Sequence, residues 1–275
     1  MKTFWQRFFG NPRVIVGLAW LGVVLVVAII APVLAPTDPF DIVGKPFLKP
    51  LDTYVLGTDS LGRSIWSGLV HGARTTLIIA VVATLASVIF GTLVGAVAGY
   101  YGGLIDDALM RLTEFFQTIP SFIFAIVLVA ILAPSATSLV IAIAVVSWPP
   151  IARVVRGEVL SVKAREFVQA AVIAGQADLA ILFRQVLPNT MSPLIVTGSL
   201  LVATAILIES ALSFLGLGAP NLMSWGFMVG AGRSFLRDAW WLVTIPGIAI
   251  LLTVLSINLV GEGLNDALNP RLADI

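Results

Sequence analysis

The sequence predicts an all-α integral membrane protein with six transmembrane helices. Of its 275 residues, 59% are hydrophobic and 11% are charged, and the mean hydropathy is +1.03. A soluble domain carries roughly 25% charged residues, so this chain has too few to coat a water-exposed surface. A helix needs about 20 apolar residues to cross a bilayer. Six segments approach or exceed that length: residues 14–35, 75–100, 108–132, 138–151, 191–217 and 241–261.

The first apolar segment, residues 14–35, is too long for the core of a signal peptide and lacks a convincing small-residue cleavage site. We therefore expect it to be retained as an anchor helix. With the outer segment that follows, it forms the expected N-terminal region, residues 1–74. The other five helices form the expected core domain, residues 75–275.

The second and third segments each carry a feature that bears on helix packing. Gly91, Gly95 and Gly99 recur every four residues along the second segment, and such a stripe lets another helix approach closely. We expect that helix to belong to this chain, with a second membrane subunit as the alternative. Pro120 interrupts the third segment, so we expect a kink there. The fourth segment is short, but residues 152–160 continue its helical pattern.

The fifth and sixth segments contain ionisable or strongly polar residues. Glu209 lies between apolar neighbours, and a charge in lipid costs at least about 2.5–3.5 kcal/mol, so its side chain is expected to face protein or water. Two interpretations stay open. Glu209 either lines a transport path, with Ser213 and Asn258, or forms an interhelical hydrogen bond that holds the bundle. Glu114, near the cytosolic end of the third segment, and the lone His71 are expected to be structural.

An amphipathic stretch, residues 157–190, separates the fourth and fifth segments. Residues 163–174 contain good helix formers, with Phe167, Ala170, Ala171 and Ala174 spaced for one face. Gly175 then interrupts the helix, a second short helix is expected over 176–184, and Leu187-Pro188 ends the stretch. The small alanine face suits a narrow groove on a partner protein. A helix lying on the lipid surface and a plain solvated connector are the alternatives.

The distribution of positive charge predicts the orientation of the chain, because cytoplasmic loops carry an excess of Lys and Arg. With the N-terminus inside, ten such residues lie in the cytosol and six outside, which favours cytoplasmic N- and C-termini. The cytosolic set is Lys2, Arg7, Arg13, Arg111, Arg153, Arg156, Lys163, Arg165, Arg184 and Arg271, and the outer set is Lys45, Lys49, Arg63, Arg74, Arg233 and Arg237. The 157–190 stretch then lies in the cytosol.

Several function classes lose support from the sequence. The chain has no Gly-x-x-x-x-Gly-Lys-Ser/Thr phosphate loop, so no ATPase site of its own is expected. Its single histidine and lack of cysteine offer no metal site, and the net charge of +1 argues against a nucleic-acid partner. A proton-coupled secondary transporter that uses Glu209 and Glu114 remains the rival class, although the inverted repeats usual in such carriers are not seen.

Five motifs stand out along the chain: residues 56–63 (LGTDSLGR) with 72–74, residues 98–103 with 110–111, residues 166–175 with 187–189, residues 209–218 with 225–226, and residues 258–271. In the third of them Ala-Ala, Gly and Leu-Pro follow one another at a fixed spacing. Taken in this order, the motifs resemble the dipeptide/oligopeptide (peptide/opine/nickel) family of ABC importer permeases, and specifically its C-type membrane subunit.

The resemblance implies a type I ABC importer permease fold and a mechanism. The stretch 157–190 becomes a coupling loop, with a coupling helix between the fourth and fifth spans, on which an ATPase subunit acts. The implied coupling residues are Glu166, Gln169, Ala170, Ala171, Gly175, Leu187 and Pro188. Implied partners are a second (DppB-like) permease subunit, two (DppD/DppF-like) ATPase subunits that bind ATP and Mg, an extracytoplasmic solute-binding protein and the lipid bilayer of the bacterial inner membrane. No cofactor is expected in this chain.

Two points of the resemblance leave alternatives open. Gln169 stands where many relatives carry a glutamate, and Gln185 stands where the general motif has Ile; Gln169 cannot make a charge-assisted hydrogen bond, which is roughly twice as strong. Glu166 keeps a carboxylate one turn earlier. Short peptides are the expected cargo, because they are the family's commonest. Nickel chelates, glutathione, opines and sugars are cargoes of other members.

Overall fold

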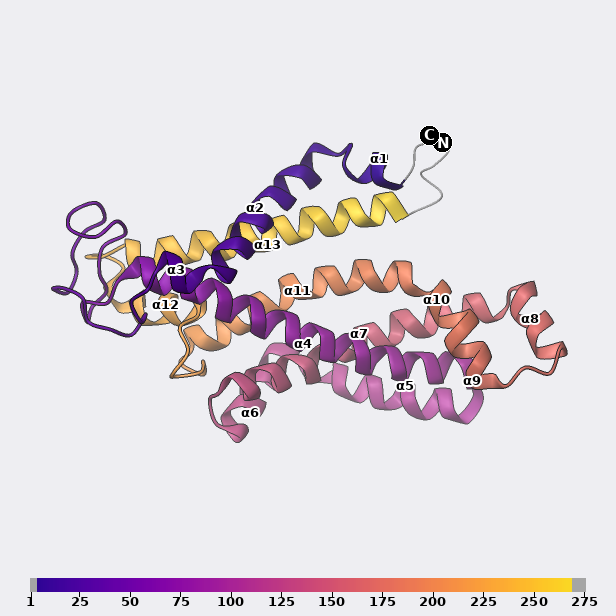
Figure 1. Cartoon of the computed structure of the whole chain (residues 1–275). Helices are drawn as coiled ribbons and strands as arrows, with labels where there is room; N and C mark the ends of the chain where they lie inside the picture. The colour runs from indigo at the N-terminus through magenta and orange to yellow at the C-terminus, as the bar shows by residue number, and fades with distance from the viewer. Residues whose placement is uncertain (1–3, 269–275) are drawn as a thin grey trace.

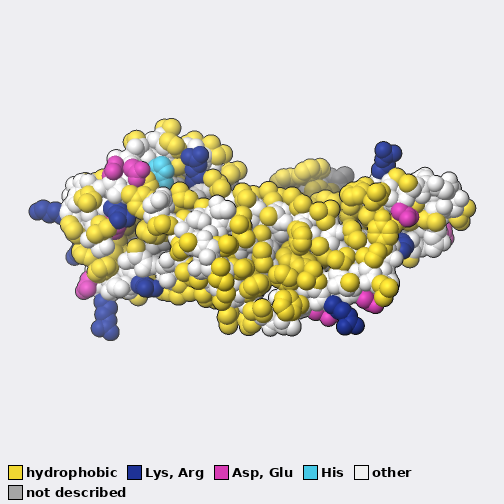
Figure 2. Space-filling view, turned by 90° about the horizontal axis from the view of Figure 1, so that it is seen from below, with side chains coloured by type: hydrophobic (Ala, Val, Ile, Leu, Met, Phe, Trp, Pro, Cys, Tyr) yellow, Lys and Arg dark blue, Asp and Glu magenta, His cyan; other side chains and the backbone are white. Residues whose placement is uncertain are grey.

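The computed structural model describes residues 4–268, which form an elongated helical bundle (Figure 1). Among these residues there is no β-strand, and three isolated bridges lie between residues 42 and 64. Figure 2 shows a broad hydrophobic belt with charged side chains at its two ends. Five helices are long and apolar enough to cross a membrane, which confirms the predicted fold class: α2 (Pro12–Ile29), α4 (Ile65–Tyr101), α7 (Ala136–Lys163), α11 (Met191–Phe214) and α13 (Trp241–Leu268).

The two ends of the bundle differ. At one end, here called the tip end, lies the connection between α7 and α11, and α1 (Phe4–Phe8) and the end of α13 also point that way. At the other, the cap end, lies the loop between α3 (Ala31–Leu34) and α4. Some predictions fall outside the described residues. They concern Lys2 and Arg271, which were included in the charge count, and residues 269–271 of the last motif.

The first and last long helices pack against each other. Val14 fills the space beside Gly263, and a Cβ atom on Gly17 would lie 2.9 Å from the Ser256 carbonyl oxygen. Trp20 Nε1 donates a hydrogen bond of 3.1 Å to Thr253 Oγ1. Small residues therefore let α2 and α13 approach closely, and a polar contact fixes their register.

The glycine stripe of α4 packs within the chain, as expected. Cβ atoms added to Gly91, Gly95 and Gly99 would lie 2.7, 2.3 and 2.9 Å from the backbone oxygens of Trp148, Ala152 and Arg156 on α7. These distances are too short for any side chain. The absence of one at each position brings the two helix backbones into contact over two turns.

The third predicted span is broken rather than kinked. Helices α5 (Gly103–Thr118) and α6 (Ser121–Leu132) meet at 86°. Pro120 has no backbone N–H, and the residue before a proline is driven out of the helical region; Ile119 is accordingly extended, with φ −89° and ψ 127°. Two consecutive non-helical residues end α5 and start α6 in a new direction, which a single kink does not achieve.

The fourth span is longer than its apolar core. Helix α7 continues from Ala136 through Pro149 and Pro150 to Lys163, as the helical pattern of residues 152–160 predicts. Its last third is held to α5 by a bidentate ion pair: Arg156 Nε and Nη2 donate to Asp106 Oδ1 and Oδ2 at 2.5 and 2.6 Å. Paired hydrogen bonds of this kind fix orientation as well as distance.

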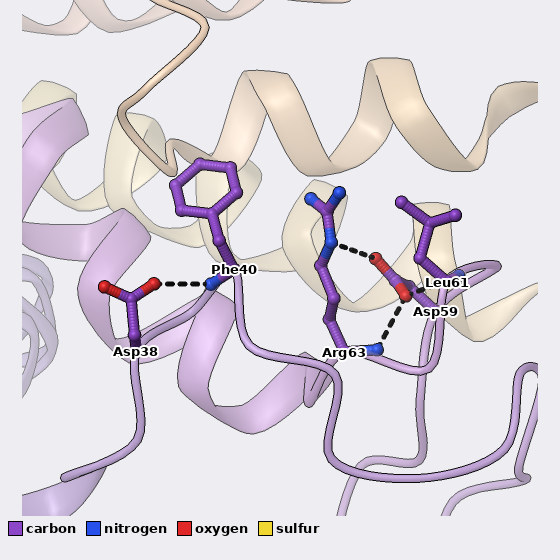
Figure 3. A network of polar contacts seen from close by, with 5 residues as sticks. All are labelled: Asp38, Phe40, Asp59, Leu61 and Arg63. Carbon is purple, nitrogen blue, oxygen red and sulfur yellow. Dashed lines mark hydrogen bonds and ion pairs between the residues drawn. The ribbon is translucent and has the colours of Figure 1, made fainter.

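The loop at the cap end is ordered by its own polar contacts (Figure 3). Asp59 Oδ1 accepts hydrogen bonds of 2.8 Å from the backbone N–H groups of Leu61 and Arg63, and Asp38 does the same for Phe40. The Arg63 guanidinium lies 5.3 Å from the centre of the Phe40 ring. Aspartates that bond their own backbone two residues on stabilise turns, so the 56–63 motif is a turn framework.

This loop rests on the elements between α11 and α13. Phe40 meets Phe227 of α12 (Trp225–Gly232) with ring centres 5.9 Å apart, and Phe47 meets Phe235 of the 3₁₀ turn η2 (Arg233–Phe235) at 5.0 Å. Trp241 Nε1 of α13 lies 3.4 Å from the Thr58 carbonyl oxygen. The cap end is therefore closed by packed aromatic residues.

Candidate functional site

The connection between α7 and α11 folds into two short arms. The first arm is α8 (Glu166–Ile173), and it ends where Gly175 adopts φ +76°. The N–H groups of Gly175 and Gln176 bond the carbonyl oxygens of Val172 and Ala171 at 3.0 and 3.2 Å, the arrangement in which a left-handed residue closes a helix. No atom lies within 4 Å of a Cβ on Gly175, so its backbone conformation, rather than space, requires glycine there.

The second arm combines three short helical pieces: α9 (Asp178–Ile181), a π-helical turn (Leu182–Val186) and α10 (Leu187–Asn189). Gln185 Nε2 reaches back to the first arm's end and donates to Gln176 Oε1 at 2.7 Å. Asn189 Nδ2 donates to the Gln185 carbonyl oxygen at 2.6 Å. Gln185, where the family pattern has Ile, thus fastens the two arms to each other, a role that its sequence position did not indicate.

Both arms are fixed to the bundle by a small apolar core. Val168, Ala171, Ile181, Leu182 and Val186 are buried and pack with the ends of α4 and α7. Val155, Val159 and Val162 of α7 and Ala96 of α4 form the other side of this core. Because protein interiors are close-packed, a push on either arm is transmitted to α4 and α7.

A polar contact adds to this anchoring at the end of α4. Tyr100 Oη donates a hydrogen bond of 2.9 Å to Asp178 Oδ1, at the start of α9. Lys163 Nζ, at the end of α7, bonds the Tyr100 carbonyl oxygen and lies 5.2 Å from the centre of its ring. Tyr100 therefore joins three elements, α4, α7 and the second arm. Tyr100 and Asp178 are 78 positions apart in the sequence, so no local sequence pattern reveals this pairing.

Among the exposed polar residues of the two arms, such as Glu166, Gln169 and Arg184, lie several large apolar side chains. These side chains form a surface, here called the tip surface, that is much more exposed than the core beneath it. It consists of Phe167 (42% exposed), Val172 (56%), Ile173 (88%), Leu179 (61%) and Phe183 (54%). Exposed apolar patches on proteins are often sites of interaction with a partner.

The structure distributes the predicted coupling residues over both sides of the arms. Glu166, Gln169, Ala170 and Pro188 are exposed, and Leu187 is half-buried. Ala171 differs from the expectation: it is 6% exposed and faces the chain's own core. Ala171 leaves the expected alanine face because it and Val168 pack against the ends of α4 and α7. The larger side chains point outward instead.

Glu209 lies at the centre of a hydroxyl cluster near the cap end of α11. Its side chain is 0% exposed. Ser213 Oγ donates to its Oε1 at 2.8 Å and Ser210 Oγ lies 3.4 Å from its Oε2, and Ser224, the residue that caps the start of α12, lies beside it. Ser213 is 4% exposed, and Asn258 is half-buried on α13. Glu209, Ser210 and Ser213 all belong to α11, so these two contacts lie within that helix, and the buried carboxyl group faces the start of α12.

Comparison with protein families gives two matches to the chain. Residues 91–274 match the family described as the binding-protein-dependent transport system inner membrane component. Residues 1–50 match the N-terminal transmembrane domain of oligopeptide transport permease C. The two matched regions include both the tip and the anchor helix.

Curated relatives resemble the chain over almost its whole length. The di/tripeptide transport system permease protein DppC of Pseudomonas aeruginosa is 41% identical over 99% of this chain and 92% of its own. The dipeptide transport system permease protein DppC of Escherichia coli is 40% identical over 99% and 93%. Among solved structures, an inward-facing MetNI methionine ABC transporter chain has a TM-score of 0.61 at 17% identity, covering 74% of this chain and 97% of that one.

Proposed function

This chain belongs to the family of binding-protein-dependent transport system inner membrane components, and on that premise we propose that it forms half of the pore of an ATP-driven importer of short peptides. Its relatives at about 40% identity are named as dipeptide or di/tripeptide permeases. In this role the chain is a pore subunit, and partner subunits bind ATP and Mg. The other half of the pore comes from a second, DppB-like permease subunit.

The tip surface is the observation that carries this proposal. Its exposed apolar side chains are held on a rigid base, as docking onto a folded partner requires. In the proposed complex the tip surface contacts one of two ATPase subunits, of the DppD and DppF types. Glu166, Gln169 and Ala170 lie beside it, while Ala171 and Gly175 set its shape.

The base of the tip explains how movement of an ATPase reaches the pore. The buried core of the two arms and the Tyr100–Asp178 bond attach the tip to α4 and α7. The glycine stripe keeps α4 and α7 in backbone contact, so these elements move together. Closure of the ATPase pair therefore rocks this unit, and the shift is limited by the difference in the partner's affinity for the two conformations.

We place the tip in the cytosol and the cap end outside, with both termini cytoplasmic in the bacterial inner membrane. The excess of Lys and Arg toward the tip supports this orientation. The ordered cap end then faces the solute-binding protein that delivers cargo. The hydrophobic belt of Figure 2 lies in the lipid bilayer.

Uptake by a strain that lacks this chain tests the cargo. Labelled di- and tripeptides, glutathione and nickel are offered in parallel, and the plasmid-borne chain is the matched control. We expect peptide uptake to fall to background and to return with the plasmid. Loss of nickel or glutathione uptake alone, with peptide uptake intact, contradicts the peptide assignment while leaving the permease assignment in place.

A further inference from the structure

A cavity with a mixed apolar and polar lining opens where the third span breaks. It has a volume of about 290 Å³ and lies between the α5–α6 break, α7 and α11. Gln117 and Ser121 from the break, Ser147 from α7 and Thr204 from α11 line it. Pro120 and Pro150 form part of its wall, so two helix interruptions meet at the same place.

The cavity lies near the middle of the hydrophobic belt. Thr204 follows the start of α11, at the tip end, by 13 residues, which at about 1.5 Å per residue is roughly 20 Å. Helix α7 starts on the side of the cap end, and Ser147 lies 11 residues, or roughly 16 Å, beyond that start. Since the hydrocarbon core of a bilayer is about 30 Å thick, these polar groups lie well inside it.

A guanidinium lies next to the cavity on the side of the tip. Arg153 is three residues beyond Pro150 and therefore on the same face of α7. Its Nη1 donates a hydrogen bond of 2.6 Å to Gln117 Oε1. Both side chains are exposed on this chain, and Arg153, 17 residues or roughly 26 Å beyond the start of α7, lies at the tip-side edge of the belt, as its place in the cytosolic charge set requires.

The break itself gives a second reason for water on this face. Irregular backbone at membrane depth is tolerated where it is buried in protein or lines a water-filled cavity. Helix α5 ends at Thr118, so the carbonyl groups of its last turn lack helical donors. They add acceptors to a site that already has an amide, hydroxyls and a cation.

We propose that this cavity is part of the translocation path, that the peptide groups of the cargo contact Gln117, Ser147 and Thr204 there, and that its terminal carboxylate contacts Arg153. Arginine suits this role because its planar N–H groups bind a carboxylate in pairs. The inference rests on the proposed function. It moves the path from Glu209 and Ser213, which are enclosed by α11 and α12, to the opposite side of α11.

Cysteine accessibility in the assembled transporter tests the path, and the natural chain contains no cysteine. Thr204→Cys is compared with Leu251→Cys, which is 62% exposed and lies on α13, a helix that contributes no residue to the cavity. In proteoliposomes we expect a charged, water-soluble thiol reagent to modify Thr204→Cys at least tenfold faster. Equal, slow modification of both positions, with normal peptide uptake, shows that lipid or the second subunit covers this face and overturns the inference alone.

Protection by cargo tests the carboxylate contact. A transported dipeptide supplied with its binding protein and ATP is expected to slow modification of Thr204→Cys severalfold. Adding Arg153→Gln should abolish that protection, Arg153→Lys should keep part of it, and Arg111→Gln, an exposed arginine on α5, should keep all of it. Full protection in the Arg153→Gln background removes Arg153 from the site. Absence of dipeptide uptake by the unmodified transporter contradicts the proposed function instead.

Discussion

Gly95 lies where α4 comes closest to α7, and alanine at this position is expected to push the two helices apart. The added Cβ would start 2.3 Å from the Ala152 carbonyl oxygen, so the backbones must separate by about 0.7 Å to reach 3.0 Å. Overpacking of this kind costs about 1–3 kcal/mol, and alanine returns up to about 1 kcal/mol of helix propensity. Because a backbone carbonyl cannot rotate away, we expect a net loss of about 1–2 kcal/mol.

The measurement is unfolding of the purified full chain in mixed micelles, titrated with a denaturing detergent and followed by circular dichroism. Gly22→Ala is the matched control, since no atom lies within 4 Å of a Cβ on Gly22 of α2. That variant should be neutral or more stable by up to about 1 kcal/mol. If Gly95→Ala is stabilised as much as Gly22→Ala, the α4–α7 contact is not the close approach described.

Three further outcomes are expected from the proposed mechanism. Ile173→Asp places a charge on the most exposed residue of the tip surface. It should leave membrane insertion intact and abolish uptake by the reconstituted transporter, whereas normal uptake with normal stimulated ATPase activity would exclude the tip as the docking surface. A cysteine at Gln176 should react with an impermeant thiol reagent only from the cytosol and one at Asp52 only from outside, and the reverse pattern in intact cells inverts the orientation. Tyr100→Phe removes a hydrogen bond to a carboxylate, worth about 1.5–3 kcal/mol, and Tyr101→Phe is its control. The Tyr100 variant should hydrolyse more ATP per peptide imported than the control, and an equal ratio of ATP to peptide in the two variants contradicts a coupling role for the bond.

The spans and the glycine stripe follow from properties that a sequence carries directly. Length and hydropathy fix which segments can cross a bilayer, and glycine at every fourth residue leaves one helix face without side chains. The partner of that face, α7, is the helix whose backbone oxygens fit beside Gly95. The end of α8 at Gly175 is equally predictable, because a left-handed residue is needed to end that helix and turn the chain.

Other features depend on contacts between distant parts of the chain. The exposed residues of α8 include Ile173 as well as Glu166 and Gln169, so hydropathy alone does not show that Ala171 turns inward and Ile173 outward. The position of α4 and α7 decides it. The 86° break follows from Ile119 leaving the helical region before Pro120, yet a proline alone is compatible with a mild kink. The cavity at the α5–α6 break combines residues of four helices, α5, α6, α7 and α11. The residues that each helix contributes do not form a sequence motif by themselves.

The pairing of α2 with α13 has a consequence for biosynthesis. Trp20 and its hydrogen-bond partner Thr253 are separated by 233 residues, which a ribosome adds in roughly 10–50 seconds at about 5–20 residues per second. Throughout that interval the anchor helix is in the membrane with its small-residue face and its indole N–H lacking their final neighbours. Of the spanning helices described, the first to be synthesised is thus among the last to complete its packing. A chain that stops before α13 leaves this side of α2 without its partner helix, a state that the cell's quality-control proteases can act on.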